Sequence, residues 1–131
     1  METTPYPTNQ ETATLVILEG ETEKKYDLSE KNIWTFGRET PSNHPDLTVE
    51  SRIVGRQHGE FRSIDGEWFY IDKGSINGTY HNGKKINNGL NGRVRPVILS
   101  NGDVLRVDSD DLDRPDRRGV RMTFMTESIC E

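Results

Sequence analysis

Dipeptides that favour tight turns separate the apolar runs of this chain, and they constrain its fold more than any other feature. Asp65-Gly66, Asn82-Gly83 and Asn101-Gly102 each stand between short runs rich in β-branched and aromatic residues. Asn-Gly and Asp-Gly supply the two positive φ values that a type I′ hairpin turn requires. No window of helical length carries apolar residues at i, i+3 and i+4 without an interrupting Gly or Pro. The sequence therefore predicts an all-β protein.

Short strands at close spacing, with turn signals between them, are typical of a sandwich or barrel. We expect strands at 14–18, 25–28, 33–36, 47–49, 59–64, 67–72, 79–81, 84–86, 104–107 and 120–126. The segment 25–28 would pair with 14–18 across a polar turn at 20–24. The segment 93–99 contains a proline and is limited to an edge or irregular position, and 87–92 is expected to form a loop.

Length and composition fit one globular domain with loose ends. The chain has 131 residues, of which 31% are hydrophobic and 30% charged, and its apolar residues are gathered into runs that can form one core. Residues 1–12 show no periodicity and are expected to form a flexible N-terminal leader. The predicted domain covers 13–127, and 128–131 form a C-terminal tail.

Charge and cysteine usage exclude several classes of protein. The net charge of −5 disfavours a nucleic-acid binder, which needs a basic footprint. Cys130 is the single cysteine, so no intrachain disulfide forms, and a reducing cytoplasm is the simplest localisation. No apolar run approaches the roughly 20 residues of a membrane helix, and residues 1–11 lack the features of a signal peptide. We expect neither a membrane nor a nucleic acid as partner.

Several motifs follow one another in a specific order. They are F-G-R at 36–38, G-R-Q-H at 55–58, the strand-ending Asp72, G-S-I-N-G-T-Y-H-N-G at 74–83 and L-S-N-G-D-V-L at 99–105. Together they resemble the forkhead-associated (FHA) domain family, over about residues 15–124. The resemblance implies a two-sheet β-sandwich of ten to eleven short, mostly antiparallel strands with ligand loops at one end. It also implies a phosphopeptide-binding module that recognises phosphothreonine in an extended peptide.

The resemblance assigns roles to individual residues. Arg38 would contact the phosphate, Gly55 and Arg56 would form another wall of the pocket, and Asn77 would hold the peptide backbone. The expected structural residues are Gly37, His58, Gly78, Asn82 and Gly83, with His58 bracing a loop. A phosphate dianion needs convergent cationic donors, and a guanidinium supplies a planar fork. An asparagine amide can pair with both the C=O and the N–H of an extended peptide.

Two positions of the predicted phosphopeptide site depart from the family pattern. Gly55 stands where the family has a phosphate-contacting Ser, and Ile76 stands where it frequently has a Thr. Two hydroxyl donors are therefore missing, each worth about 1.5–3 kcal/mol. An alternative function follows, an FHA-fold scaffold or self-association domain with weak or no phosphate dependence, in which Ile76 would contribute to an apolar contact patch.

Simpler interpretations compete with these roles. On composition alone Arg38 would be an ordinary surface arginine, and Asn77-Gly78 an ordinary turn dipeptide. Only the order of the motifs favours a ligand-facing role. A late group of basic residues is most simply a mixed-charge surface, although it could face a second partner; it comprises Arg93, Arg95, Arg114, Arg117, Arg118 and Arg121.

The residues offer little support for catalysis or for a metal. His44, His58 and His81 have no Cys, Asp or Glu at ligand spacing. The acidic run at 108–113 has Asp113 where an EF-hand needs Gly, and Gly119 where it needs Glu. Ser51 and Ser75 lack the context of a hydrolase nucleophile. We expect no enzyme activity and no cofactor. The expected partner is a phosphothreonine-containing protein, a Ser/Thr kinase or its substrate, bound by a monomer.

Overall fold

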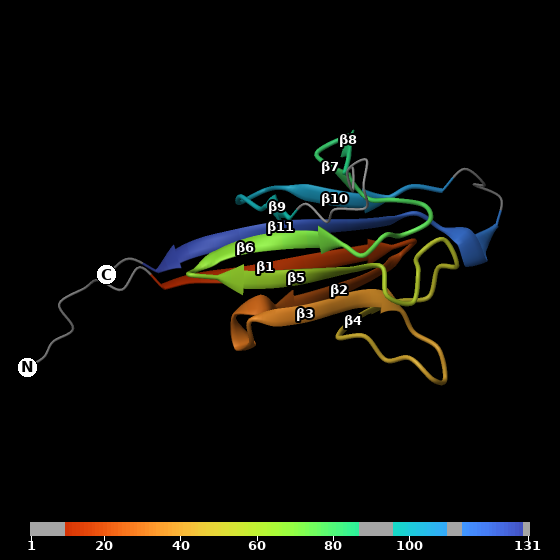
Figure 1. Ribbon diagram of the computed structural model, residues 1–131, viewed down its shortest axis with the longest axis horizontal. Coiled ribbons are helices and arrows are strands. Elements are labelled where there is room, and N and C mark those ends of the chain that lie inside the picture. The colour runs from red at the N-terminus through yellow and green to blue at the C-terminus, as the bar shows by residue number, and fades with distance from the viewer. Residues whose placement is uncertain (1–9, 87–95, 110–113, 130–131) are drawn as a thin grey trace, which may run out of the picture.

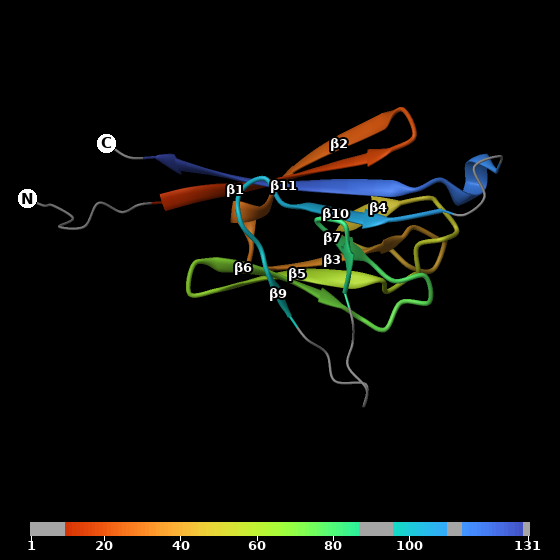
Figure 2. The ribbon, with the colours of Figure 1, turned by 90° about the horizontal axis from the view of Figure 1, so that it is seen from above.

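Two β-sheets pack face to face in the computed structural model, which describes residues 10–86, 96–109 and 114–129 (Figures 1 and 2). Over these residues there are eleven strands, in sheets of six and five. Among the described residues, all the strand pairings are antiparallel except that of β3 with β4. The predicted all-β sandwich is confirmed.

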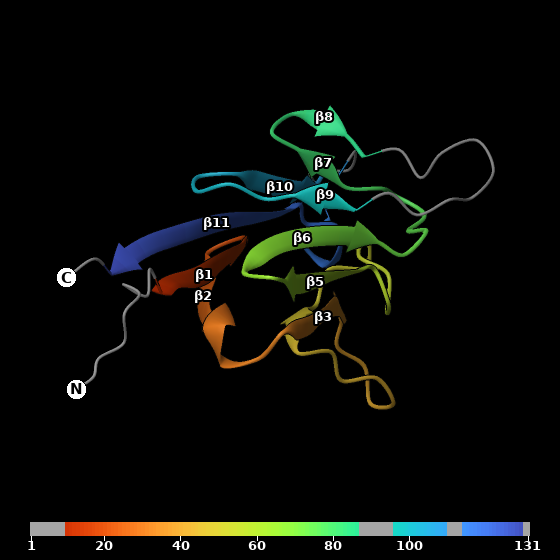
Figure 3. The same ribbon diagram turned by 60° about the vertical axis from the view of Figure 1, so that its left-hand side comes forward.

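The six-stranded sheet has the order β2(Thr22–Asp27), β1(Gln10–Glu19), β11(Val120–Ile129), β10(Val104–Val107), β7(Tyr80–His81) and β8(Lys84–Lys85). The five-stranded sheet has the order β4(Leu47–Val49), β3(Ile33–Arg38), β5(Gly59–Ile64), β6(Glu67–Asp72) and β9(Val97–Ile98). Two short 3₁₀ turns, η1(Leu28–Glu30) and η2(Pro115–Arg117), lie in the connections. Figure 3 shows the start of β1 and the end of β11 extending side by side past the β5–β6 hairpin.

Several strand boundaries differ from the prediction. The first hairpin turn is tighter than expected, because Gly20 adopts φ +62° and β2 begins at Thr22. The predicted strand 25–28 is wrong at its end, since the carboxylate of Asp27 accepts from Ser29 N–H at 3.0 Å and starts η1. β1 begins at Gln10 and β11 ends at Ile129, and these two residues are paired in the sheet. The strands thus overlap the predicted leader and tail.

Other predictions fall partly outside the described residues. Of the segment 93–99, Val97–Ile98 forms an edge strand, in agreement with its proline. The predicted loop 87–92, the basic residues Arg93 and Arg95, most of the acidic run 108–113 and Cys130 lie outside the described ranges.

The two hairpins that the turn dipeptides predict are confirmed. Asp65 and Gly66 connect β5 to β6 with φ values of +53° and +83°. Asn82 and Gly83 connect β7 to β8 with φ values of +50° and +87°. Both pairs of positive φ values are those of a type I′ turn.

Alternating side chains from both sheets form one core. In β6, Trp68 and Tyr70 are buried whereas Phe69 and Ile71 are partly exposed, as the period of a strand requires. The ring of Tyr70 packs edge-to-face on Phe61 with centroids 5.0 Å apart. A Cβ atom on Gly59 would lie 2.1 Å from the Tyr70 hydroxyl oxygen, so glycine at this position lets the hydroxyl reach the loop end of the sandwich.

Side chains from the other sheet close the outer edge of β4. Val49 C=O accepts from Glu39 N–H on the β3 side, so the backbone groups of Thr48 and Glu50 face outward. Lys24 Nζ donates to Thr48 C=O at 3.2 Å, and the Glu19 carboxylate accepts from Glu50 N–H at 3.0 Å. This edge is therefore not free to pair with another strand. No helix within the described ranges is long and apolar enough to cross a membrane.

Candidate functional site

Three connections meet at the end of the sandwich opposite the β5–β6 hairpin (Figure 1). They are 39–46, 50–58 and 73–79. A cleft of about 520 Å³ lies among them, lined by Ser42, Asn43, Gly55, Arg56, Gln57, Gly74, Ser75 and Ile76. Its volume is within the range of small ligand sites.

Close backbone packing joins the F-G-R and G-R-Q-H motifs. Arg38 N–H at the end of β3 donates to Gly55 C=O at 3.0 Å. A Cβ atom on Gly37 would lie 2.1 Å from the carbonyl oxygen of Arg56. Only glycine permits this approach, and the result is that Arg38 and Arg56 stand on adjoining backbone segments.

Asn43 joins the same two segments to the connection 39–46. Its side-chain N–H₂ group donates to Arg38 C=O at 3.0 Å and to Arg56 C=O at 2.9 Å. Its backbone exchanges hydrogen bonds with Thr40, at 2.9 and 3.2 Å. We call the two side-chain bonds of Asn43 the Asn43 clip. It was not predicted, because an Asn in a loop carries no signal of a partner far away in the sequence. It fixes one wall of the cleft.

A buried hydrogen-bond network supports the cleft from below. The hydroxyl of Thr79 donates to Asp72 Oδ1 at 3.0 Å and lies 3.1 Å from the Tyr70 hydroxyl and 3.0 Å from His58 Nε2. His58 Nδ1 accepts from Gly55 N–H at 3.0 Å, so Nε2 carries the proton in a neutral ring. Burial lowers the pKa of His58, against the opposing effect of the Asp72 charge. His58 thus connects Gly55 to Thr79.

The carboxylate of Asp72 also shapes the connection 73–79. It accepts from Gly74 N–H at 3.2 Å, from Ser75 N–H at 3.1 Å and from the Ser75 hydroxyl at 2.7 Å. This leaves Ile76 97% exposed at the mouth of the cleft. Asn77 donates from Nδ2 to Ile53 C=O at 2.8 Å, which ties this connection to 50–58.

The two arginines of the motifs have no carboxylate partner in the part of the chain that the structure describes. Within the described ranges, Arg38 and Arg56 form no ion pair, whereas four other arginines do; these are Arg52, Arg62, Arg106 and Arg114. Arg38 Nε is buried and has no hydrogen-bond partner in this part of the chain. As far as the described residues show, the site therefore holds two positive charges without an ion-pair partner, in a protein of net charge −5, an arrangement suited to an anion.

The predicted residues do not all line the cleft. Gly55, Arg56 and Ile76 do. Arg38 adjoins the cleft through its bond to Gly55, and Asn77 directly follows the lining residue Ile76. Sequence reasoning missed the cleft residues Ser42, Asn43 and Gln57.

The other histidines are engaged elsewhere. His44 pairs with Glu39, and His81 Nε2 lies 2.8 Å from an Asp103 carboxylate oxygen. In the described part of the chain, no group of three or more His, Cys, Asp or Glu side chains is placed to hold a metal ion.

Comparison with known proteins identifies the family. A family model described as "FHA domain" matches residues 34–108. The chain belongs to the FHA domain family. This confirms the resemblance that the motifs carry, and the matched range includes every predicted site residue of this FHA domain.

Curated relatives include two bacterial proteins that are named an inhibitor and a regulator. The chain is 36% identical over 70 residues to the oxoglutarate dehydrogenase inhibitor of Corynebacterium diphtheriae, covering 52% of this chain and 43% of that protein. It is 30% identical over 95 residues to the glycogen accumulation regulator GarA of Mycobacterium tuberculosis, covering 72% of this chain and 52% of GarA. The chain thus spans about half the length of these relatives.

Solved structures share the fold. Yeast Pml1p has a TM-score of 0.68 and 25% identity, covering 91% of this chain and 84% of Pml1p. An FHA domain solved in work on phosphothreonine-dependent FHA interactions has a TM-score of 0.65 and 20% identity, covering 90% of this chain and 99% of that domain.

Proposed function

We propose that the cleft binds the phosphate of a phosphothreonine in an extended peptide, and that the domain is a non-catalytic phosphopeptide-binding module. The observation that carries this proposal is a pair of arginines at the cleft between the FHA motifs, Arg38 and Arg56, which have no ion-pair partner among the described residues. A phosphate carries about −1.5 to −2 charges at neutral pH. Among the described residues, neither guanidinium gives up an ion pair when it turns toward such an anion.

In this proposal each residue has a separate role. Arg56 contacts the phosphate from the cleft wall, and Arg38 turns its guanidinium toward the phosphate from the end of β3. Gly55 supplies open space beside Arg56. Asn77 holds the peptide backbone through Oδ1 and its second Nδ2 hydrogen, since one Nδ2 hydrogen is donated to Ile53 C=O. Ile76 packs against the peptide at the mouth, where 97% of it is exposed.

Titration calorimetry with phosphothreonine peptides selected from a degenerate library tests the proposal. We expect binding to the phosphorylated peptide and none to its unphosphorylated form. Arg56→Ala removes one charge-assisted contact, worth about 1.5–3 kcal/mol, and so weakens binding about 10- to 150-fold. Arg121→Ala is the matched control, because Arg121 is exposed on β11 of the other sheet. No binding at millimolar phosphopeptide by a folded domain would contradict the proposal.

The exposure of Ile76 favours one alternative, a scaffold or self-association domain that does not depend on phosphate. Sedimentation analysis and partner capture before and after phosphatase treatment separate the two functions. Partner capture that is unchanged by phosphatase treatment and by Arg38→Ala supports the scaffold function.

We further propose a cytoplasmic monomer without enzymatic activity, folding as a unit over about 13–127, whose partner is a phosphorylated protein such as a Ser/Thr kinase or a kinase substrate. Membership of the FHA domain family and the regulatory roles that the relatives' names give support the proposal of an interaction module without enzymatic activity.

A further inference from the structure

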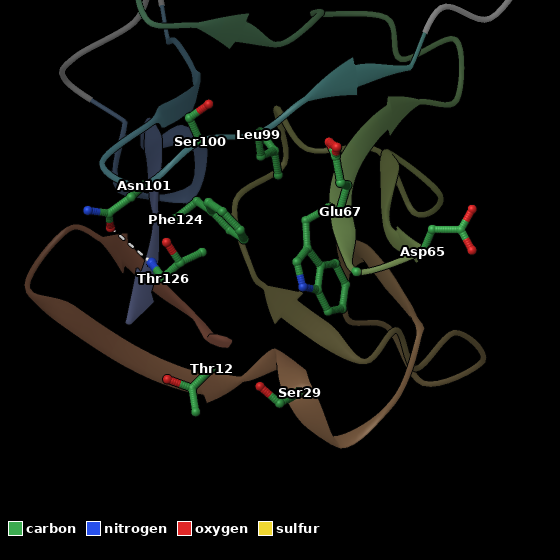
Figure 4. Close-up of a pocket in the computed structure, with 11 residues that line it drawn as sticks. Thr12, Ser29, Asp65, Glu67, Leu99, Ser100, Asn101, Phe124 and Thr126 are labelled. Carbon is green, nitrogen blue, oxygen red and sulfur yellow. Dashed lines mark hydrogen bonds between the residues drawn. The ribbon is translucent and has the colours of Figure 1, made fainter. Parts of the chain in front are cut away.

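A second and larger cleft opens at the end of the sandwich that carries the β5–β6 hairpin (Figure 4). It has a volume of about 930 Å³ and lies between the two sheets. β6 and the segment after β9 contribute to one side, and β1 and β11 to the other; the lining residues are Thr12, Ser29, Asp65, Gly66, Glu67, Trp68, Leu99, Ser100, Asn101, Phe124 and Thr126. The six residues of β6 separate it from the phosphate cleft by about 20 Å.

The floor of this second cleft is apolar. Trp68, Leu99 and Phe124 line it, and all three are at least nine-tenths buried in the sandwich. Figure 4 shows the Phe124 ring in the middle of the lining, with Asp65 and Glu67 to one side and Asn101 and Thr126 to the other. An apolar floor with a few polar groups around it is the usual composition of a binding site.

The indole N–H of Trp68 is accessible from the second cleft. Among the described residues it donates no hydrogen bond, and it is not one of the buried polar atoms that lack a partner, so it reaches solvent. The other tryptophan is satisfied within the protein, since Trp34 Nε1 lies 3.0 Å from Leu28 C=O and 3.1 Å from Lys31 C=O. A ligand that offers a carbonyl oxygen can replace water at the Trp68 N–H.

The rim of the second cleft is acidic. Asp65 and Glu67 are exposed, and within the described ranges neither forms an ion pair. No Lys or Arg is among the residues that line the cleft. A ligand with a positive charge beside its apolar part is therefore complementary to both the rim and the floor.

We propose that this cleft docks an unphosphorylated segment of a second protein, with an apolar side chain flanked by Lys or Arg. The apolar side chain lies on Trp68, Leu99 and Phe124, a backbone carbonyl accepts from the Trp68 indole, and the basic side chain pairs with Glu67 or Asp65. Residues 1–9 contain no Lys or Arg and so lack the basic side chains of such a segment. With two sites at opposite ends, the domain can bridge a phosphorylated protein and a second one.

Nitrogen-15 NMR of the full chain tests the docking site through its two indole signals. The probe is a pool of blocked eight-residue peptides with Leu, Ile, Phe or Trp at a fixed position and Lys or Arg on both sides. A matched pool carries Glu in place of the basic residues. We expect the basic pool to move the Trp68 indole signal and leave that of Trp34 in place, and the acidic pool to move neither.

A paired variant tests the role of the rim. Asp65→Asn and Glu67→Gln keep the size of the side chains, and Asn tolerates the positive φ of Asp65. Each substitution is expected to weaken binding of the basic pool about two- to fivefold, with affinity for a phosphothreonine peptide unchanged. This second readout separates the docking site from the phosphate cleft.

Three results would overturn the docking proposal. The first is a Trp68 signal that stays in place at millimolar basic pool. The second is a Trp68 signal that shifts equally with the basic and the acidic pool, or a paired variant that binds the basic pool as tightly as the parent does. The third is that deletion of residues 1–9 shifts the Trp68 indole signal in the same way as the basic pool does. The peptides would then act only by displacing residues 1–9 from the cleft.

Discussion

Restoring the two missing hydroxyls is expected to strengthen phosphothreonine binding. The structure has room for both. A Cβ atom on Gly55 would meet only His58 Cα and Nδ1, each at 3.9 Å, which is ordinary contact. Ile76 is 97% exposed, so Thr at this position removes nothing from the core. A hydroxyl bonded to a phosphate is worth about 1.5–3 kcal/mol, and ordering the side chain costs about 0.5–1 kcal/mol. The net gain of about 1–2 kcal/mol is a five- to thirtyfold increase in affinity per hydroxyl.

Matched controls separate the hydroxyl from the change of shape. Gly55→Ser is compared with Gly55→Ala, which adds the same Cβ and the same backbone stiffness. Ile76→Thr is compared with Ile76→Val, which has nearly the same volume and branching. Titration calorimetry with one phosphothreonine peptide should rank Ser above Ala and Thr above Val. Equal affinities within both pairs, in folded proteins, would refute the placement of these two residues at the phosphate.

Three further predictions concern the support of the phosphate cleft. Thr79→Val removes the hydroxyl shared by Asp72, Tyr70 and His58, and should lower the unfolding free energy in urea by about 1–3 kcal/mol; an unchanged midpoint would contradict the network. The pKa of His58 lies below 6.5 because the ring is buried, so its contribution to stability is complete above pH 6.5 and is lost as the pH falls toward the folded pKa. Between the folded and unfolded pKa values, the slope of the unfolding free energy against pH approaches about 1.4 kcal/mol per pH unit. Urea unfolding at several pH values should show a smaller slope for His58→Asn, whatever the total stability of that variant. Asn43→Ala should reduce the free energy of phosphopeptide binding more than it reduces the free energy of unfolding. Calorimetry and urea unfolding of the same sample measure the two changes, and a larger loss of unfolding free energy would contradict the role of the Asn43 clip.

The fold was predictable because its turns have local signatures. Asp65-Gly66 and Asn82-Gly83 adopt the positive φ values that their residue types favour, and both hairpins follow. The end of β2 was not predictable in the same way. Asp27 uses its carboxylate to bond Ser29 N–H and begins a 3₁₀ turn, so a local side-chain bond competes with the strand that the apolar residues indicate.

The candidate site was predictable only where a motif implied it. Gly55 and Arg56 line the cleft, and the requirement for Gly37 explains why Arg38 lies beside them. The Asn43 clip and the bonds of Thr79 to His58 and Tyr70 join residues distant in sequence. A hydrogen bond of this kind leaves no pattern in a single sequence, because any loop Asn or strand Thr could form it or point into solvent.

The side-chain N–H of Arg38 offers the most direct test of phosphate recognition. In the free protein this group has no hydrogen-bond partner among the described residues. Nitrogen-15 NMR during titration with a phosphothreonine peptide should shift the Nε–H signals of Arg38 and Arg56 and leave that of Arg121 unchanged. The dephosphorylated peptide should shift none of them. Signals of Arg38 and Arg56 that stay in place at saturating phosphopeptide, or that move equally with the dephosphorylated form, would contradict the assignment of this cleft to phosphothreonine.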